Sequence, residues 1–577
     1  MRSIVASSGL LLVLILNIFA VGCTTIVVET GTIEETVRSV YVESQYTSHE
    51  PIVITSNQDF ADQGWPGNGT EINPYLIQGL SIASDETCVS ISSTDAYFNI
   101  SDCYFSYSSD EGLGTGVFLD TAQNGVIERC EFTNLKNGIS LTDSDNQIIA
   151  FNEIAVVEFA ANENILLQRS DHCEVYNNSI VSAGTYGIRV ASSIDALIAN
   201  NSLYNEIYGM RIDTSVDCVV IDNKFEKSGL HIYGYEIAHF LTNTFENNTV
   251  GGRPIAVLTG RFHETIDAST YGQLFLFDSS DCIVENGNFD YRCTGVLLAY
   301  CSDCIVRDLS SVYSVLCLVE LHGCSNTLVT GCDVIEALNV AFRFRDTVNC
   351  TLTGCSSGSL SSGPAGVHLF GTVNTTISRS LFQVRGIIAY SSVDCSIIEN
   401  EFEGKGWAEE YGIRLSGPHN TTVAGNNLHG FYTAIFCESD ATNGTIFNNT
   451  IHDNHYYGIR LSGTSGFRVY NNSFWYNSQA NALDDGLQNY WDDSVSLGNL
   501  WNDYSGSGVY YISGSAGSID HYPGVYQTPS TATTTSTAAT TPTPPNGPPL
   551  PEDILFIGIG VLSIMVVAIV IVFLKKR

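Results

Sequence analysis

A short unit recurs through most of this chain, and it constrains the fold more than any other sequence feature. The unit is about 22–24 residues long and repeats between residues 97 and 476. Its form is Asp/Asn-x-x-Val/Ile-x-x-Asn-x-Phe/Ile, a polar spacer and then Gly-Ile-x-Leu, as in residues 172–190 and 195–212. Apolar and polar residues alternate at period two, which is typical of β-strands, and the strands are too close together for helices between them.

A unit of this length, with three short strands and three turns, is one coil of a parallel β-helix. One coil cannot bury its apolar side chains alone, so successive coils must stack and share a core. The sequence therefore predicts an all-β parallel β-helix of about fourteen coils, because the repeat recurs about that often. The repeats span residues 97–480, with an N-terminal cap and the first coils at 51–96 and a C-terminal cap at 481–526. Residues 247–276 break the period and are expected to project as a loop or hairpin.

One asparagine recurs at the same position of the coil and is expected to form a ladder along the axis. Asparagine tolerates left-handed turns, and stacked amide side chains can hydrogen-bond to one another. We predict a structural role for the members of this ladder, which are Asn178, Asn201, Asn223, Asn400, Asn427, Asn449 and Asn472.

Both ends of the chain point to a membrane. Residues 1–23 are apolar behind Arg2 and are interpreted as a signal peptide or an uncleaved anchor, followed by a linker at 24–50. Residues 527–551 are rich in Thr and Pro and predict an extended stalk. Residues 552–577 contain an uncharged apolar run and end in Lys-Lys-Arg, which predicts a transmembrane helix with a basic cytoplasmic end. We expect a single-pass protein of the cell membrane with an extracellular ectodomain.

The charge of the chain excludes one class of partner. With 24 Lys and Arg against 61 Asp and Glu, the net charge is −37. A nucleic-acid binder needs a basic surface, so we expect no nucleic-acid partner. Eleven Asn-x-Ser/Thr sequons suit an exterior location and predict a glycoprotein. The sequons begin at Asn68, Asn99, Asn177, Asn200, Asn247, Asn349, Asn374, Asn420, Asn443, Asn448 and Asn471.

One position of the repeat gathers cationic and aromatic side chains in this otherwise acidic protein. The x of Gly-Ile-x-Leu points out of the coil because its neighbours point in. A groove for an anionic or neutral glycan is one interpretation, since Arg binds carboxylates and aromatic rings stack on sugars. A solvated row of Arg residues, each paired with a nearby carboxylate, is the other. The predicted ligand-binding strip consists of Arg189, Arg211, His231, Arg343, His368, Arg414, Phe436 and Arg460.

The chain has 17 cysteines, and many fall at fixed positions of the coil. Neighbours along the axis lie about 4.8 Å apart, within range of a disulfide, and an exterior location permits oxidation. Small apolar filling of the core explains the same pattern equally well. The candidate pairs in register are Cys282–Cys304, Cys332–Cys355 and Cys301–Cys324.

Three segments carry a resemblance to a known family. They are residues 59–79, which look like an N-terminal capping motif of archaeal-type members, residues 248–276, and residues 489–523 with Trp491 and Trp501. The chain resembles the right-handed parallel β-helix repeat family of NosD-type periplasmic copper-binding proteins and of carbohydrate-binding and sugar-hydrolase-like repeat proteins. The resemblance implies a right-handed solenoid at the cell surface. The Asp-rich stretch usual in the closing motif is replaced here by residues 506–518, so we expect no resident cofactor and no metal site. Calcium stays open, and copper is disfavoured because the chain has only 3 Met.

Three functional hypotheses follow. The leading one is a non-catalytic surface β-helix that binds or displays extracellular carbohydrate. The second is a polysaccharide lyase, hydrolase or epimerase, which needs clustered carboxylates or a carboxylate beside an Arg. Asp281 with Asp303, and Asp484 with Asp485, are the acidic pairs considered, but turn chemistry explains both, and no catalytic residue is assigned. The third is a structural spacer of the cell envelope.

Overall fold

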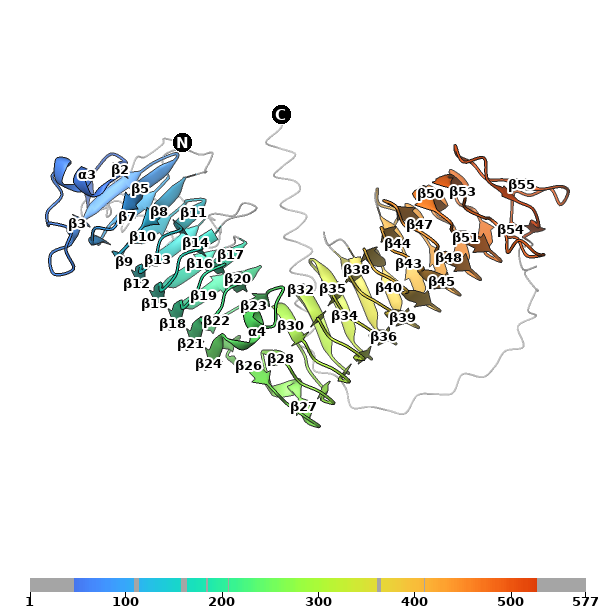
Figure 1. Cartoon of the computed structure of the whole chain (residues 1–577), viewed down its shortest axis with the longest axis horizontal. Coiled ribbons are helices and arrows are strands. Elements are labelled where there is room, and N and C mark those ends of the chain that lie inside the picture. The colour runs from blue at the N-terminus through green and yellow to red at the C-terminus, as the bar shows by residue number, and fades with distance from the viewer. Residues whose placement is uncertain are drawn as a thin grey trace, which may run out of the picture. The chain divides into compact units, whose positions relative to one another are not determined.

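The computed structural model describes residues 46–526 apart from 108–113, 157–162, 183–184, 206, 361–364 and 409. Over these residues the chain is a parallel β-helix whose coils contribute short strands to three faces. Equivalent residues of successive coils pair directly, so Ile139 lies beside Ile165 and Ile165 beside Ile188. The predicted all-β fold is confirmed, and Figure 1 shows the coils as two runs that meet at an angle near β23 (Leu230–Tyr233) and β30 (Arg292–Ala299).

One face of the β-helix, called the strip face below, carries the predicted ligand-binding strip. In the first run it is formed by β2 (Ile52–Ile54), β5 (Thr87–Thr94), β8 (Thr115–Ala122), β11 (Asn137–Thr142), β14 (Glu163–Gln168), β17 (Tyr186–Ala191), β20 (Tyr208–Asp213) and β23 (Leu230–Tyr233). In the second run it is formed by β26 (Arg253–Thr259), β28 (Gln273–Phe277), β30 (Arg292–Ala299), β32 (Ser310–His322), β35 (Val340–Arg345), β38 (Ala365–Phe370), β41 (Ile387–Tyr390), β44 (Tyr411–Ser416), β47 (Thr433–Glu438), β50 (Tyr457–Ser465) and β53 (Ala480–Leu487).

The β-helix has about 19 turns, so the predicted number of about fourteen was too low. The missed turns lack the Gly-Ile-x-Leu signature and lie at the two ends and at the junction. Their strands on the strip face are β2, β5, β26, β28 and β53, which the pairing register places in line with the recognised coils.

The other two faces run parallel to the strip face. The second face extends from β3 (Tyr75–Gln78) to β24 (Thr244–Glu246) in the first run, and from β27 (Thr265–Asp267) to β51 (Arg468–Tyr470) in the second. The third face begins with β1 (Thr47–Ser48) and β4 (Leu80–Ala83) and ends with β54 (Leu500–Trp501) and β57 (Gly524–Val525). The short helices are α3 (Asn57–Asp62), α4 (Ala238–Leu241) and η1 (Ala268–Thr270).

Buried asparagines form two ladders at one turn of the coil. Each amide donates to the side-chain oxygen of the next, as Asn178 does to Asn201 at 3.0 Å, and so satisfies backbone groups that have no strand partner. The members are Asn152, Asn178, Asn201, Asn223 and Asn248, then Asn400, Asn426, Asn449, Asn472 and Asn499. Asn427 was assigned to the wrong position, because its side chain points outward and donates to Glu401.

The cysteines fill the core as reduced thiols. All 16 cysteines of the described residues are buried and none is in a disulfide. The proposed pairs Cys282–Cys304, Cys332–Cys355 and Cys301–Cys324 are therefore not bonded in the structure. Their thiols lie close to backbone carbonyls instead, as in Cys301 to Leu276 O at 3.2 Å and Cys324 to Leu298 O at 3.3 Å. The alternative role as small core filler accounts for the pattern.

The segment that breaks the repeat builds the junction between the two runs. Residues 247–276 were expected to project, but only the turn between β25 (Thr249–Val250) and β26 forms a hairpin. The rest supplies coil strands, since β26 pairs in parallel with β28. At β28 and β30 the outward positions are apolar, and Phe275, Phe277 and Leu297 are buried by the end of the first run. Phe240 of α4 packs on Phe277 with ring centroids 5.5 Å apart. The stacking direction changes at the place where these side chains are buried (Figure 1).

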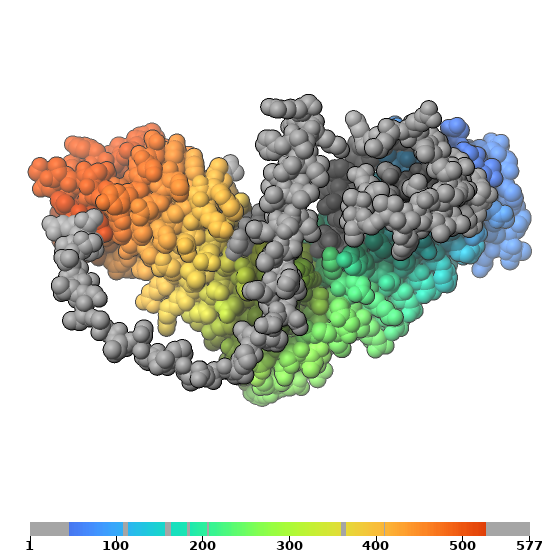
Figure 2. Space-filling model, turned by 180° about the vertical axis from the view of Figure 1, so that it is seen from behind, coloured from blue at the N-terminus to red at the C-terminus, as the bar shows by residue number. Residues whose placement is uncertain are grey.

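A buried amide links the two runs through the junction. Gln273 is fully buried, and its Nε2 donates to Leu230 O at 2.9 Å and to Thr294 O at 2.7 Å. Leu230 belongs to the first run and Thr294 to the second, so one side chain joins both backbones. Figure 2 shows the coils packed continuously through this junction.

Apart from residues 46–50 of the predicted linker, the segments predicted at the two ends of the chain lie outside the described residues. Within residues 46–526, with the gaps stated, no helix has the length and apolar character needed to cross a bilayer. The signal peptide, the stalk at 527–551 and the span at 552–577 stay predictions, and so does the linker at 24–50 as far as residue 45. The described end of that linker contains β1, which pairs with β4.

Candidate functional site

The pairing registers place the predicted strip in two rows on the strip face. In the first run, Leu166 lies beside Arg189, Arg189 beside Arg211, and Arg211 beside His231. In the second run the row consists of Glu320, Arg343, His368, Ile388, Arg414, Phe436 and Arg460.

The junction brings the adjoining ends of the two rows together around a cavity of about 550 Å³, called the junction pocket below. This volume lies in the range of small-ligand sites, about 300–1,000 Å³. Five residues of the predicted strip line it, namely Arg189, Arg211, His231, Arg343 and His368. The other lining residues include Gln168, Ser192, Tyr208, Asp213, Thr214, Tyr233, Tyr235 and Arg345.

A buried charged group lies beneath the pocket. Glu320 is 2% exposed, and its Oε2 lies 3.4 Å from His231 Nε2 and 3.7 Å from Arg343 Nη1. Burial alone would raise the pKa of Glu320, but the charge of Arg343, with His231 and Arg345, holds that pKa well below its usual range. Burial lowers the pKa of His231, although the neighbouring Glu320 carboxylate acts to raise it. Glu320 is therefore ionised and fixes Arg343 at the base of the pocket.

The first run contributes a second paired set. Arg189 donates to Glu163 at 2.8 Å and to Asp213 at 3.0 Å, and Arg211 Nη2 lies 3.3 Å from the same Asp213 oxygen. Burial alone would lower the pKa of Arg189, but its two carboxylate partners outweigh burial and raise it. Both Arg residues are therefore held in place as cations.

Arg345 differs from the other three Arg residues of the pocket. Its Nη1 donates to the Tyr233 hydroxyl at 2.9 Å, and its guanidinium lies 4.8 Å from the centre of the Tyr233 ring. The same ring is contacted from the first run by Arg211 at 5.0 Å. Among the described residues, no carboxylate forms an ion pair with Arg345.

Two titratable side chains of the pocket lining, His368 and Tyr208, are uncharged at pH 7. Burial, helped by Arg343 and Arg345, lowers the pKa of His368 to about 4, so this imidazole is neutral at pH 7. Burial raises the pKa of Tyr208, which keeps its hydroxyl protonated. The pocket thus combines fixed guanidinium donors with a neutral imidazole and aromatic rings.

The remaining strip residues lie outside the pocket. Arg414 is paired with Glu438, whose Oε1 accepts from Nε at 2.6 Å, as the solvated-row interpretation predicts. Phe436 is 7% exposed and packs under Arg460, whose guanidinium lies 5.0 Å from its ring centre. Phe436 is therefore covered by Arg460 and is not an open platform for a sugar ring.

Sequence reasoning missed Arg345, Tyr233 and Asp213. Arg345 follows Arg343 by two residues in Phe342-Arg343-Phe344-Arg345, so period two places both guanidiniums on the outer side of β35. That signal was available in the sequence. The partnership with Tyr233 was not, since 112 residues separate the two.

The acidic pairs considered as catalytic candidates are structural. Asp281 and Asp303 occupy left-handed turns, with φ of 56° and 55°, on the exposed corner of the second run. Asp484 is fully buried in the C-terminal cap, where it accepts from Trp491 Nε1 at 2.9 Å and from Ser518 Oγ at 2.7 Å. Asp485 accepts from the Ser515 backbone and hydroxyl.

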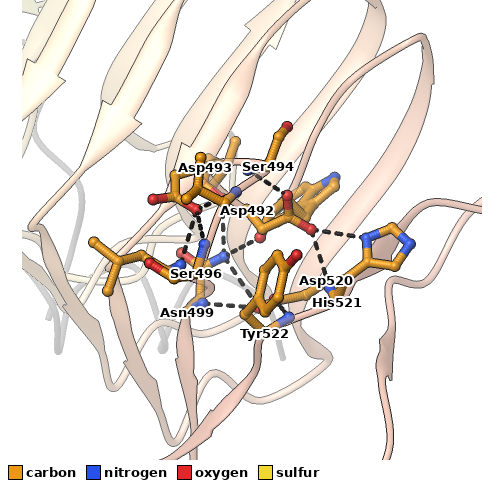
Figure 3. Close-up of polar contacts among 12 residues, drawn as sticks. Asp492, Asp493, Ser494, Ser496, Asn499, Asp520, His521 and Tyr522 are labelled. Carbon is orange, nitrogen blue, oxygen red and sulfur yellow. Dashed lines mark hydrogen bonds and ion pairs between the residues drawn. The ribbon is translucent and has the colours of Figure 1, made fainter.

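The rest of the cap uses carboxylates in the same way (Figure 3). Asp493 accepts from the backbone of Val495 at 2.8 Å and of Ser496 at 2.7 Å, while Asp492 lies 2.8 Å from His521 Nδ1. Asp520 accepts from the backbone N–H of Asn499 at 2.7 Å. These bonds hold the loop that closes the β-helix.

Comparison with known families agrees with this architecture. The family model described as "Right handed beta helix region" matches residues 87–250, and the one described as "Periplasmic copper-binding protein (NosD)" matches residues 317–506. The chain belongs to the right-handed β-helix repeat proteins of the NosD type. The predicted family is thereby confirmed, and its archaeal-type character stays a prediction. No curated protein shows significant similarity to this β-helix repeat protein.

Solved structures give only distant likenesses. The lacto-N-biosidase of Eubacterium ramulus is 10% identical, with 69% of this chain and 70% of that chain covered and a TM-score of 0.22. An alginate lyase from Paenibacillus sp. is 12% identical, with 75% and 99% covered and a TM-score of 0.16. The surface adhesin PfbA of Streptococcus pneumoniae is 9% identical, with 82% and 98% covered and a TM-score of 0.19. At these TM-scores the likenesses carry no argument about the function of the β-helix repeat protein.

The NosD description names copper, and the donor set of the pocket does not suit it. In the described part of the chain, no group of three or more His, Cys, Asp or Glu side chains could hold a metal ion. His231 and His368 lie among guanidiniums, which disfavour a further cation. No metal is therefore assigned to the pocket of this β-helix repeat protein.

Proposed function

We propose that this β-helix repeat protein binds an acidic saccharide of the cell exterior in its junction pocket. The observation that carries the proposal is the convergence of Arg189, Arg211, Arg343 and Arg345 from two runs of coils in one cavity. Guanidinium forks suit carboxylates, and Tyr208, Tyr233 and Tyr235 supply the aromatic surface that saccharide rings prefer.

The proposed setting is the cell surface. The predicted membrane span at 552–577 and stalk at 527–551 would hold the β-helix away from the bilayer, where extracellular glycans or envelope components are its partners. We propose a binding role, because the acidic pairs considered for hydrolysis serve the turns and the cap.

The test is binding of the purified full-length protein to neutral and acidic glycans at low and high salt. An Arg211→Gln variant is compared with Arg414→Gln, a strip residue outside the pocket that already has a carboxylate partner. We expect binding that weakens with salt, falls at least about tenfold in Arg211→Gln and is kept in Arg414→Gln. Binding to no glycan would overturn the proposal and favour a structural spacer, and equal loss in both variants would move the site from the pocket to the whole strip.

A second candidate is an enzyme that removes a proton from a uronate. It is favoured by His368, which is neutral at pH 7 and lies beside Arg343 and Arg345 in the pocket lining. Elimination would produce an unsaturated uronide, and epimerisation would exchange the C5 hydrogen with solvent. Incubation of a bound polyuronate in deuterated water, followed by mass spectrometry, detects both, and an unchanged polymer would exclude this candidate.

A further inference from the structure

The charges of the junction pocket are unevenly matched. Four guanidiniums line it, and three carboxylates, Glu163, Asp213 and Glu320, form ion pairs with Arg189, Arg211 and Arg343. In the part of the chain that the structure describes, Arg345 has no ion pair with a carboxylate. One positive charge is therefore left over, and it is located on Arg345.

The surroundings of Arg345 leave one side of its guanidinium unused. Nη1 is held by the Tyr233 hydroxyl, and the rings of Tyr233 and Phe370 lie 4.8 and 5.5 Å from the guanidinium carbon. Its Nε is buried and has no hydrogen-bond partner within the described residues, which is also true of the Nε atoms of the other three pocket arginines. Of these four described guanidiniums, Arg345 is the one that also lacks a carboxylate partner. A buried donor without a partner is costly, so an acceptor is expected from outside the chain. The Nε–Nη2 side of a guanidinium is a planar pair of donors that matches a carboxylate.

The rest of the lining restricts the ligand further. Asp213 and the Glu320 beneath the pocket would repel a second negative charge. Gln168, Ser192 and Thr214 supply amide and hydroxyl groups that suit the hydroxyls of a sugar. A uronic acid unit, with one carboxylate on a ring of hydroxyls, meets all of these conditions.

We propose that Arg345 is the specificity-determining residue of the junction pocket and selects a saccharide unit with a single planar carboxylate over a neutral or sulfated one. This inference rests on the proposed saccharide-binding function. It adds the class of sugar and the residue that recognises it.

The test measures affinities of the full-length protein for oligomers of galacturonate, glucuronate and mannuronate. Each oligomer is paired with its carboxyl-reduced form and with a sulfated derivative of that reduced form. We expect the wild type to prefer at least one uronate at least about tenfold over both derivatives. Arg345→Gln is expected to lose the preference and to bind the reduced oligomer as the wild type does. Arg414→Gln is expected to keep the preference.

Tyr233→Phe is a second variant that removes only the hydroxyl bound to Arg345 Nη1, and its preference is expected to fall to an intermediate value. Unchanged circular dichroism spectra and melting temperatures serve as folding controls. Equal affinity of the wild type for reduced and carboxylated oligomers, tight binding of the sulfated ones, or an unchanged preference in Arg345→Gln would overturn this inference and leave saccharide binding standing. Binding of no oligomer would overturn both proposals.

Discussion

Burial and neighbouring charges together decide the protonation of side chains in and beneath the junction pocket. Glu320 is ionised although it is 2% exposed, because Arg343 and His231 contact it. Among the described residues, no carboxylate forms an ion pair with His368, so burial and the neighbouring Arg residues lower its pKa to about 4. The positive charge of the pocket therefore comes mainly from its guanidiniums, and their charge does not change with pH in the physiological range.

The pKa of His368 makes stability depend on pH. Its pKa in the folded protein, about 4, lies below the ordinary value of 6.5, so between those values the unfolded chain binds a proton that the folded protein does not. Stability therefore falls as the pH falls from 7 towards 4, by about 2 kcal/mol between pH 7 and pH 5. A His368→Asn variant is expected to lose this part of the pH dependence, measured as urea midpoints at both pH values. His172→Asn, at an exposed turn, is the control, and equal slopes for wild type and His368→Asn would contradict the prediction.

At the same scale, the sequence pattern predicted positions better than partners. The alternation in β17, β20, β35 and β38 correctly placed Arg189, Arg211, Arg343 and His368 on the outer sides of their strands, because period two fixes which side of a strand a residue occupies. Asn427 was misplaced by one residue because Asn426 beside it satisfies the same motif. The contact of Arg345 with Tyr233 could not be predicted, since it depends on which coils meet at the junction.

The turns of each coil connect its strands, and one of them carries the asparagine ladder. The buried amides of this ladder form hydrogen bonds from one coil to the next. Asn426 accepts from the Asn400 backbone at 2.9 Å and donates to Ile397 O at 2.8 Å and to Asn449 at 2.9 Å. Its neighbour Asn427 makes one exposed bond to Glu401. Two asparagines adjacent in sequence thus differ in burial and in the number of partners.

We therefore expect Asn426→Ala to destabilise the protein by about 2–4 kcal/mol, because buried backbone and amide groups of two neighbouring coils lose their partners. Asn427→Ala removes one exposed bond and is expected to change stability by less than about 0.5 kcal/mol. Denaturant unfolding, with amide exchange of the coils around residues 397–449, measures both. Similar losses in the two variants would show that the ladder contributes no more than a surface bond.

Elements without the repeat signature were the ones that the sequence left uncertain. The repeat signature consists of a small residue followed by two apolar residues that point inward. The strands β5, β28 and β53 depart from this signature, although β5 and β53 still alternate between inward and outward residues and β28 is buried on both sides. In β28, Leu274 to Phe277 is a continuous apolar run, because the first run covers its outer face. A continuous apolar run in place of alternation was the available sign that another part of the chain packs there.

At the scale of the whole molecule, the candidate site exists because the β-helix changes direction. A straight stack would keep the rows of Arg residues on an open face, where each Arg pairs with a carboxylate as Arg414 does with Glu438. The junction instead sets Arg211 and Arg345 on one Tyr233 ring beside an open cavity. The repeat predicted the solenoid and the strip, but the pocket depends on an interruption of the repeat and could not be predicted from it.

The C-terminal cap of the β-helix also belongs to the scale of the whole molecule. A stack of coils must cover the apolar core of its last coil. Trp501 performs this closure: it is fully buried, stacks on Phe474 with centroids 4.5 Å apart and donates to Asp520 at 2.9 Å.

Trp501→Ala is expected to cost about 3–5 kcal/mol and to expose the last coil, so that the protein associates as its concentration rises. Trp475→Ala removes an outward ring stacked on His452 and is expected to cost about 1 kcal/mol without association. Thermal unfolding and light scattering after size-exclusion chromatography distinguish the two, and a monomeric Trp501→Ala as stable as Trp475→Ala would show that the coil is closed by other residues.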